Sequence, residues 1–394
     1  LDCVRESLRL ALEELSEQVP SSERPEWWPR LWERYVETQT DYRASQETLV
    51  RKMVEAGTDA QQLLGWLSSG PGQKVAGGTQ AKLLTRVFGE QFEVVAISAG
   101  AQPKTKEQLS SDRVQNPHDP DATYAAKGKG EQKKEHVGYK VQVAETVSEA
   151  VLAPGEPTRN FIAGMVTHAA RESDEEGALK MEAEQKDLGL EKPPVQYVDA
   201  AYISTAKLLE AAAEGRELIG PAPAPANNTQ GRFTSQSFQV AVEQRQALCP
   251  AGHPNTQCSR LQEQATSKVF YRFEWDTATC AACPLRPQCI QATHRHRTLV
   301  VSEHHTILQA RRREQQTEPF KKRMKHRNAI EGTQSELVRA HGLRRARYRG
   351  LAKVRLQNYL IGGACNLKRW LRRLAWEMRQ TALTTSLSAA SGAS

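Results

Sequence analysis

The spacing of apolar residues changes along this chain, and that change limits the possible folds more than any other feature. Up to about residue 95, apolar residues recur at helical intervals, as in Val4, Leu8 and Leu15. Residues 136–146 instead alternate between apolar and polar, which is typical of a strand with one buried face. We therefore expect an all-α segment followed by an α/β core.

The all-α segment is expected over residues 1–100. It contains an aromatic stripe at helical spacing, and the stripe consists of Trp27, Trp28, Leu31, Trp32 and Tyr35. Such side chains could stack on nucleic-acid bases, but at this spacing they more often pack in a core, and we expect packing. Residues 101–135 are polar and rich in Lys, Gln, Gly and Pro, which favours an exposed connection.

The α/β core is expected over residues 136–225 as a mixed sheet with helices. The expected strands lie near 136–146, 160–167, 195–199 and 217–221, and the expected helices lie near 173–188 and 205–214. The run Ser173-Asp174-Glu175-Glu176 matches a capping box, which predicts a helix start.

Positive charge is concentrated late in the chain. Lys and Arg number 54 against 46 Asp and Glu, a net charge of +8, and the basic runs cluster after residue 290. We expect a long basic helical stretch at about 304–341 and a second at 348–380, within a region of 301–381, followed by a disordered tail at 382–394. A solvated helix surface would explain the charge, but a polyanion such as DNA is the favoured partner.

The chain lacks the apolar runs of membrane proteins and of secretory signals. No stretch approaches the roughly 18 apolar residues of a membrane span, and the first residues mix acids and bases. We expect no membrane partner and a cytoplasmic location. Because position 1 is Leu and lies in a helical pattern, we also expect the chain to begin inside a longer reading frame.

Five of the seven cysteines fall between positions 249 and 289. Thiolates at short loop spacing suit a closed tetrahedral zinc site, so residues 226–300 are expected to be a Cys-rich insertion holding one structural Zn²⁺. The preferred ligands are Cys249, Cys280, Cys283 and Cys289. Cys258 or His253 could replace one of them, and free buried thiols are the alternative without metal.

Two carboxylates are candidates for catalysis. Asp199 ends an apolar strand just before a helix, which is where α/β folds bind ligands, although it could simply cap that helix. Glu331 lies on the basic helix four residues after Arg327, so it is either an ion-pair partner or a metal ligand. The residues themselves leave both alternatives open.

Six short motifs follow one another in an order that resembles the bacterial insertion-sequence DDE transposases with a Cys-rich insertion before the last carboxylate. They are Asp119-Pro-Asp-Ala122, Gly138-Tyr-Lys-Val-Gln142, Val198-Asp-Ala-Ala-Tyr202, Cys280-x2-Cys-Pro-Leu285, Arg327-x3-Glu331 and Arg347-Tyr-Arg-Gly350. The resemblance covers nearly the whole chain. It implies an RNase H-like fold and a DNA transposase that cleaves element ends and transfers strands.

The resemblance also implies roles for individual residues. The second and third carboxylates of the family correspond to Asp199 and Glu331, which would be ligands of two catalytic Mg²⁺ ions. Arg327 matches the Arg of the family's last signature, but Met324 and Val338 stand where that signature has Tyr and Lys. DNA contacts are expected from the basic residues Arg327, Arg344, Arg345, Arg347, Arg349 and Lys353.

The first carboxylate of the family has no clear counterpart. Family members carry it on a strand before a helix like residues 1–15, so we expect it upstream of residue 1, and Asp121 is the less favoured alternative. A chain with two of three ligands is expected to be inactive on its own. The resemblance also implies a homo-oligomer on DNA, associated with the nucleoid of a bacterial cell. A non-catalytic DNA-binding remnant and a zinc-stabilised nuclease are the competing interpretations.

Overall fold

The computed structural model describes residues 1–38, 45–94, 100–128, 130–224, 231–264, 267–291 and 293–391. Two compact units are present. The first unit comprises 1–143, 165–177 and 341–365, and the second comprises 144–164, 178–340 and 366–394. Within the described ranges, no helix combines the length and apolar character needed to cross a membrane.

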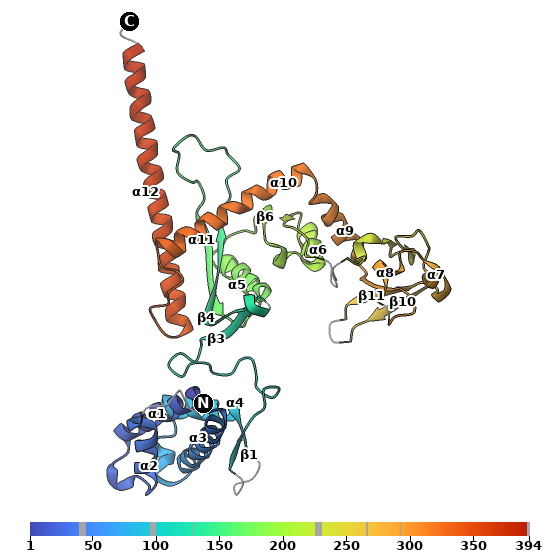
Figure 1. The fold of residues 1–394 in the computed structure, drawn as a ribbon. Helices are drawn as coiled ribbons and strands as arrows, with labels where there is room; N and C mark the ends of the chain where they lie inside the picture. The colour runs from blue at the N-terminus through green and yellow to red at the C-terminus, as the bar shows by residue number, and fades with distance from the viewer. Residues whose placement is uncertain are drawn as a thin grey trace. The chain divides into compact units, whose positions relative to one another are not determined.

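The first unit begins with the expected helical segment, whose helices gather around one core (Figure 1). Its elements are α1 (Asp2–Gln18), η1 (Ser21–Glu23), α2 (Trp28–Trp32), η2 (Glu33–Glu37), α3 (Gln46–Leu67), η3 (Gly70–Lys74), α4 (Thr79–Gln91), β1 (Phe92–Val94) and β2 (Ala101–Pro103). Leu8, Leu12 and Leu15 of α1 are fully buried, as their helical spacing predicts. Trp28 is buried too and packs edge-on against Trp66, so the packing role of the aromatic stripe is confirmed.

A three-stranded sheet in the order β3-β4-β5 follows in the chain. Its strands are β3 (Thr123–Lys127), β4 (Lys134–Glu145) and β5 (Ile162–Ala169), with the short η4 (Gly130–Gln132) between the first two. β3 falls inside the expected polar connection and pairs antiparallel with β4. β3 was not predicted because its extended conformation is stabilised by hydrogen bonds to β4 and is not marked by an apolar pattern of its own.

The capping box at Ser173 is confirmed. Ser173 N–H donates to Glu176 Oε2 at 2.7 Å, and Glu176 N–H donates to Ser173 Oγ at 3.1 Å. These reciprocal bonds open α5 (Asp174–Asp187), where the sequence predicts a helix.

The second unit contains a parallel pair of strands and its helix. These are β6 (Val195–Tyr197), η5 (Ala200–Tyr202), α6 (Thr205–Ala213) and β7 (Glu217–Ile219). The α/β character of the chain is thus confirmed. Within the described residues, however, β6 and β7 form a sheet of their own and do not join the single mixed sheet that we expected.

The Cys-rich segment has more regular structure than its sequence suggested, apart from residues 226–230, which lie outside the described ranges. It holds η6 (Ser235–Ser237), β8 (Gln239–Ala241), β9 (Gln246–Leu248), β10 (Gln257–Gln262), β11 (Val269–Glu274), α7 (Thr277–Ala282), α8 (Arg286–Cys289) and β12 (Thr298–Ser302). β10, β11 and β12 form an antiparallel sheet beside α7 and α8 (Figure 1). Phe273 of β11 is fully buried at the centre of this core.

The basic stretch is broken where one long helix was expected. It consists of α9 (His305–Glu314), α10 (Glu318–Met324), the 3₁₀ helix η7 (Lys325–Asn328) and α11 (Ala329–Arg339). Thr317 caps α10 through its side chain, and Pro319 lies in the first turn, where its missing N–H breaks no helical bond. The cap and the proline together favour a new helix start at this point.

The last helix, α12 (Leu351–Ser391), is longer than predicted. We expected disorder from residue 382, but the helix continues to Ser391, and only 392–394 lie outside the described residues. The sequence between Thr381 and Ser391 contains neither Gly nor Pro, so no residue with a strong tendency to break a helix interrupts it.

Candidate functional site

Asp199 lies just beyond the carboxyl end of β6, as the sequence predicts. It is the residue before η5, but its side chain makes no capping hydrogen bond there and is 60% exposed. The alternative in which Asp199 only caps a helix is therefore wrong. Its carboxylate is open to solvent on the surface of the second unit.

Glu331 lies in the first turn of α11, and its side chain is 63% exposed. Arg327 joins the two candidate carboxylates: its Nη1 donates to Asp199 Oδ1, and its Nη2 donates to Glu331 Oε1 at 3.0 Å. The predicted intrahelical ion pair is thus present, and it shares its arginine with Asp199. Two acids that are far apart in the sequence meet around one guanidinium group.

One face of α10 and η7 holds Arg327 in this position. Arg323 forms a two-pronged ion pair with Glu217 of β7, with distances of 2.5 and 2.6 Å. The ring of His326 lies 5.8 Å from the ring of Tyr197 of β6. Positions 323, 326 and 327 are three and four residues apart and so share a helix face, which is a signal that our sequence analysis did not use.

The opposite side of α11 is fixed by a buried ionic network in the second unit. Arg369 is 5% exposed and donates to Glu145 Oε1 at 2.7 Å, to Thr333 Oγ1 at 2.7 Å and to the Asn160 carbonyl at 3.0 Å. The Glu145 side chain is 4% exposed. Thr333, two positions after Glu331, also donates to Glu145, so this part of α11 is held to the interior. The network thereby fixes the direction in which Glu331 projects.

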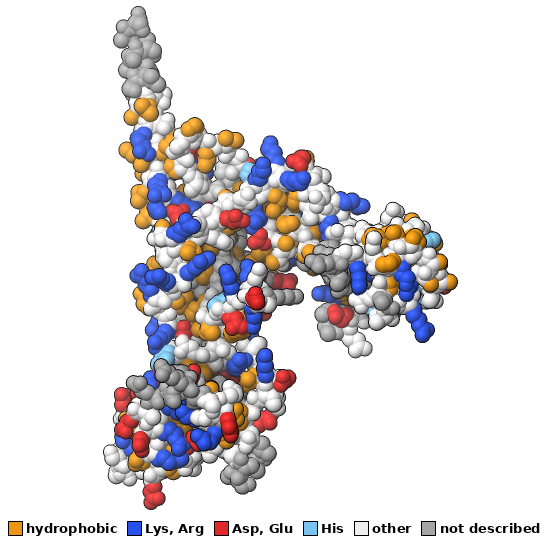
Figure 2. Space-filling view, viewed as in Figure 1, with side chains coloured by type: hydrophobic (Ala, Val, Ile, Leu, Met, Phe, Trp, Pro, Cys, Tyr) orange, Lys and Arg blue, Asp and Glu red, His pale blue; other side chains and the backbone are white. Residues whose placement is uncertain are grey.

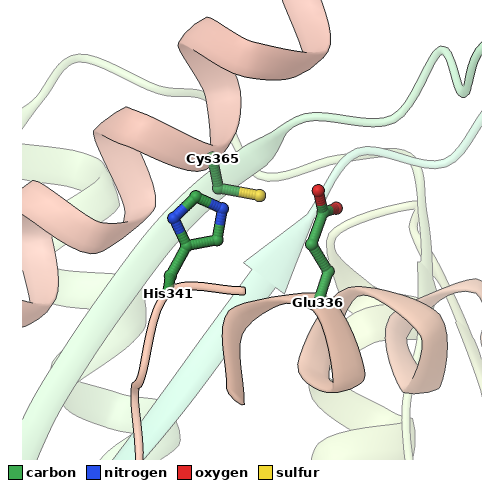
Figure 3. Close-up of side chains that lie close together, drawn as sticks. All are labelled: Glu336, His341 and Cys365. Carbon is green, nitrogen blue, oxygen red and sulfur yellow. The ribbon is translucent and has the colours of Figure 1, made fainter. Parts of the chain in front are cut away.

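Glu336 of α11, whose side chain is drawn in Figure 3, is an ion-pair partner within the same network. Its Oε1 accepts from Lys368 Nζ at 3.0 Å, and its Oε2 accepts from Arg369 Nη2 at 3.0 Å. Burial alone would raise the pKa of Glu336, but the hydrogen bonds from Lys368 and Arg369 outweigh burial and lower it. Glu336 is therefore negatively charged, and its ion pairs hold Lys368 and Arg369 in place.

Asp121, the less favoured candidate for the first carboxylate, has a structural partner within the first unit. Its Oδ2 accepts from the backbone N–H of Leu351 at 2.9 Å, at the first residue of α12. A carboxylate at a helix N-terminus satisfies a free N–H group and interacts favourably with the helix dipole. The bond accounts for an acid at this position without catalysis.

The four preferred thiols of the Cys-rich segment occupy the ends of its elements. Cys249 directly follows β9, Cys280 lies in α7, Cys283 directly follows α7, and Cys289 ends α8. Cys280 and Cys289 are buried in the core of this segment, and Cys249 packs against them. The N–H of Arg297 donates to Cys280 Sγ at 3.5 Å.

Cys289 has the other three thiols as its electrostatic neighbours. Burial raises its pKa most, Arg297 lowers it, and Cys280, Cys249 and Cys283 raise it further. Metal-binding thiols oppose each other's ionisation in this way until a cation arrives. The four sulfurs do not all lie within 4.8 Å of one another, so they are more open than a filled zinc site, where about 3.8 Å is expected from tetrahedral bonds of about 2.3 Å.

The alternative zinc ligands have other surroundings. Cys258 lies within β10, and its thiol has a pKa raised by burial and lowered only by Arg245. His253 contributes its backbone carbonyl, which accepts from Cys249 N–H at 2.9 Å and from Trp275 Nε1 at 2.9 Å. Cys258, like Cys249, packs against the core that contains Cys280 and Cys289.

The basic loop, residues 341–350, precedes α12 in the first unit. Arg344, Arg345, Arg347 and Arg349, together with Lys353 of α12, are exposed, and within the described residues their side chains make no ion pair or hydrogen bond. On the visible face of α12, further Lys and Arg side chains lie among hydrophobic ones (Figure 2). Their charge is available to a polyanion.

The backbone of the basic loop is held by buried polar side chains. Gln357 accepts from Arg347 N–H at 2.8 Å and donates to the Arg345 carbonyl at 2.9 Å. Asp119 Oδ1 accepts from Gly350 N–H at 3.0 Å and from the Tyr139 hydroxyl at 2.5 Å. The loop thus presents its arginines from a fixed backbone.

His341 and Cys365 lie at the two ends of the first unit's last segment and are also drawn in Figure 3. Cys365 is fully buried, and His341 has a buried Nε2 atom without a hydrogen-bond partner among the described residues. Sequence analysis assigned neither residue a role. Two side chains alone fall short of the ligand number of a structural metal site.

Comparison with known proteins gives one match. Residues 248–371 match the model of a family described as a transposase DDE domain. The match begins just before Cys249 and contains Arg327 and Glu331, whereas Asp199 lies upstream of the matched residues. It supports a DDE transposase. No curated protein matches the chain.

Proposed function

We propose that this chain is a DDE-type transposase of a bacterial insertion sequence that cleaves element ends and transfers strands with divalent metal ions. The observation that carries the proposal is the meeting of Asp199 and Glu331 at Arg327, together with the transposase DDE domain match at 248–371. The proposal includes an RNase H-like core, DNA as partner and a homo-oligomer on DNA in the bacterial cytoplasm.

Asp199 and Glu331 would be the protein ligands of the catalytic metal. Both offer exposed carboxylate oxygens, which Mg²⁺ prefers, and both have room for the waters and phosphate oxygens that Mg²⁺ retains. Bound there, two ions would activate the attacking oxygen and stabilise the leaving one. The first carboxylate of the family has no assignment among the described residues.

Arg327 would have two tasks in this proposal. Without metal it neutralises two acids that would otherwise repel each other. When metal takes their charge, its guanidinium group is free to turn to a DNA phosphate, which it can bind through two parallel hydrogen bonds. Arg327 is then both a competitor of the metal and a DNA ligand.

Binding of Mn²⁺ to the chain tests this assignment without requiring cleavage. Asp199→Asn and Glu331→Gln should each weaken binding, because each removes a charged ligand while nearly preserving shape. Arg327→Met should strengthen binding by about two- to thirtyfold, since it removes two competing ion pairs worth about 0.2–1 kcal/mol each. Asp187→Asn is the matched control, as Asp187 is an exposed acid at the end of α5.

Weaker Mn²⁺ binding by the carboxylate variants and stronger binding by Arg327→Met would distinguish metal ligands from acids that only form ion pairs. If Mn²⁺ bound equally well to the wild type and to both carboxylate variants, Asp199 and Glu331 would be ion-pair partners only. The chain would then be a non-catalytic DNA-binding protein in which the pairing of both acids with Arg327 is structural. A zinc-stabilised nuclease would bind Mn²⁺ in the predicted way but would hydrolyse DNA without joining strands.

The Cys-rich segment would hold one structural Zn²⁺ through Cys249, Cys280, Cys283 and Cys289. The support is their clustering around a common core, the backbone N–H bond to Cys280 and the mutual influence of the four thiols. With all four positions taken by thiolates, such an ion would order this segment and take no part in cleavage.

A further inference from the structure

A cavity of about 490 Å³ lies in the first unit, where α1 and α4 face residues 117–120 and the basic loop. None of the side chains that line it is acidic, and none is Phe, Tyr or Trp. Four of them are basic: Lys82 and Arg86 of α4, His118 and Arg349. The cavity therefore favours an anion.

Two of the four basic side chains are free to meet a ligand. Arg86 is paired with Glu90 at 2.7 Å, and His118 Nε2 lies 2.6 Å from Glu6 Oε1. Lys82 and Arg349, in contrast, have no ion-pair or hydrogen-bond partner within the described part of the chain. These two set the positive charge of the cavity.

The chain fixes Arg349 near α4 through a short series of hydrogen bonds. His118 joins α1 through Glu6, and the next residue, Asp119, accepts from the N–H of Gly350 at 3.0 Å. Asp119 is itself buried. The backbone beside Arg349 is thus anchored at the cavity before any ligand binds, which lowers the entropic cost of binding.

Polar groups of α4 complete the lining. The backbone N–H groups of Thr79, Gln80 and Ala81 donate to Glu14, so the start of α4 is already capped and binding must rest on side chains. The Gln80 side chain lines the cavity, and its Oε1 is buried without a partner. If the side-chain amide of Gln80 rotates by half a turn, its nitrogen takes the position of its oxygen. The amide then presents an N–H donor to the cavity.

We propose that this cavity binds one backbone phosphate of duplex DNA between Lys82 and Arg349. The inference rests on the proposed function and deepens it, because it adds the N-terminal helical segment to a DNA surface that sequence analysis placed only after residue 290. A phosphate oxyanion is the ligand chemistry, and the neighbouring exposed arginines of the basic loop favour a continuous DNA backbone as its source.

The test is the salt dependence of DNA binding by the whole chain, measured without divalent metal on a short fluorescent duplex. Lys82→Gln and Arg349→Gln should each weaken binding. The double variant should lower the slope of log affinity against log salt by about one unit, because one phosphate contact is lost. Lys74→Gln removes the same charge from η3, an exposed part of the same segment outside the cavity, and should leave the slope unchanged.

Several outcomes would overturn the inference. If the wild type binds DNA and Lys82→Gln, like Lys74→Gln, leaves affinity and salt slope unchanged, this site is excluded while the proposed function stands. A loss of two slope units in the double variant would place the two side chains on separate phosphates. Stabilisation of the wild type, but not of Lys82→Gln, by inorganic phosphate with unchanged DNA binding would make the ligand a free anion. A wild type that fails to bind DNA would remove both proposals.

Discussion

Replacing Arg369 by Met should loosen α11, the helix that carries Glu331. Arg369 and Glu145 are almost fully buried, and the guanidinium group makes the ion pair with Glu145 as well as the bond to the Asn160 carbonyl. Removing the arginine leaves a buried carboxylate without its countercharge. Breaking a buried pair from one side costs about 3–5 kcal/mol, far more than the pair contributes over an apolar replacement.

Hydrogen–deuterium exchange of α11 amides measures this cost locally, which avoids assuming that two units unfold together. A loss of about 3–5 kcal/mol corresponds to exchange about a hundredfold to a few thousandfold faster, at about 1.4 kcal/mol per factor of ten. Amides of α1, in the other unit, are the internal reference. Arg372→Met removes an exposed arginine of the same helix and should change α11 exchange by less than about threefold.

A double variant shows whether charge is the cause. Adding Glu145→Met to Arg369→Met removes the stranded carboxylate, so α11 should recover much of its protection, as buried ion pairs are often replaced by apolar residues at little cost. If the single variant accelerated exchange less than tenfold, or if the double variant were no better protected, the ionic explanation would be refuted.

Three further predictions concern metal, pH and salt. Metal analysis of the purified chain should find about one zinc per chain. The Cys283→Ser variant should lose this zinc, and the Cys258→Ser variant should keep it. The reverse pattern would require the alternative ligand set. The hydrogen bond from Arg159 lowers the pKa of Glu156 to about 2 from an ordinary 4.5, so its contribution to stability is present above pH 4.5 and disappears as pH falls towards 2. Thermal melts of Glu156→Gln should therefore depend less on pH in that window than those of the wild type. Replacing both Arg344 and Arg345 by Gln should reduce the salt slope of DNA binding by about two units, and an unchanged slope would exclude these side chains from the interface.

The sequence predicted those features that local pattern determines. The helical spacing of Leu8, Leu12 and Leu15 predicted α1, and the reciprocal acid and hydroxyl at Ser173 predicted the start of α5. The position of Asp199 at the carboxyl end of a strand was predicted from the apolar residues that precede it. Each of these properties depends on neighbours within a few residues, which is the range over which a single sequence is informative.

Features that depend on distant partners were missed. Arg369 appears in the sequence as one basic residue among many on a charged helix, and only the fold shows that it is buried against Glu145. Likewise, the bridging role of Arg327 requires β6 to lie beside η7. The strands of the Cys-rich segment were missed because Val269–Glu274 does not alternate strictly, and its strand is stabilised by pairing with β10 and β12.

The bonds from Asp119 and Asp121 to Gly350 and Leu351 span 231 and 230 residues of chain. During synthesis, the two acids leave the ribosome long before the residues they hold. The basic loop therefore gains its fixed backbone only when translation has passed residue 351, and closure of so long a segment is slow compared with helix formation. A growing chain can fold its N-terminal helices early, yet it acquires the anchored arginines among its last steps. Ribosome-bound intermediates arrested before residue 350 should accordingly lack this part of the affinity for DNA.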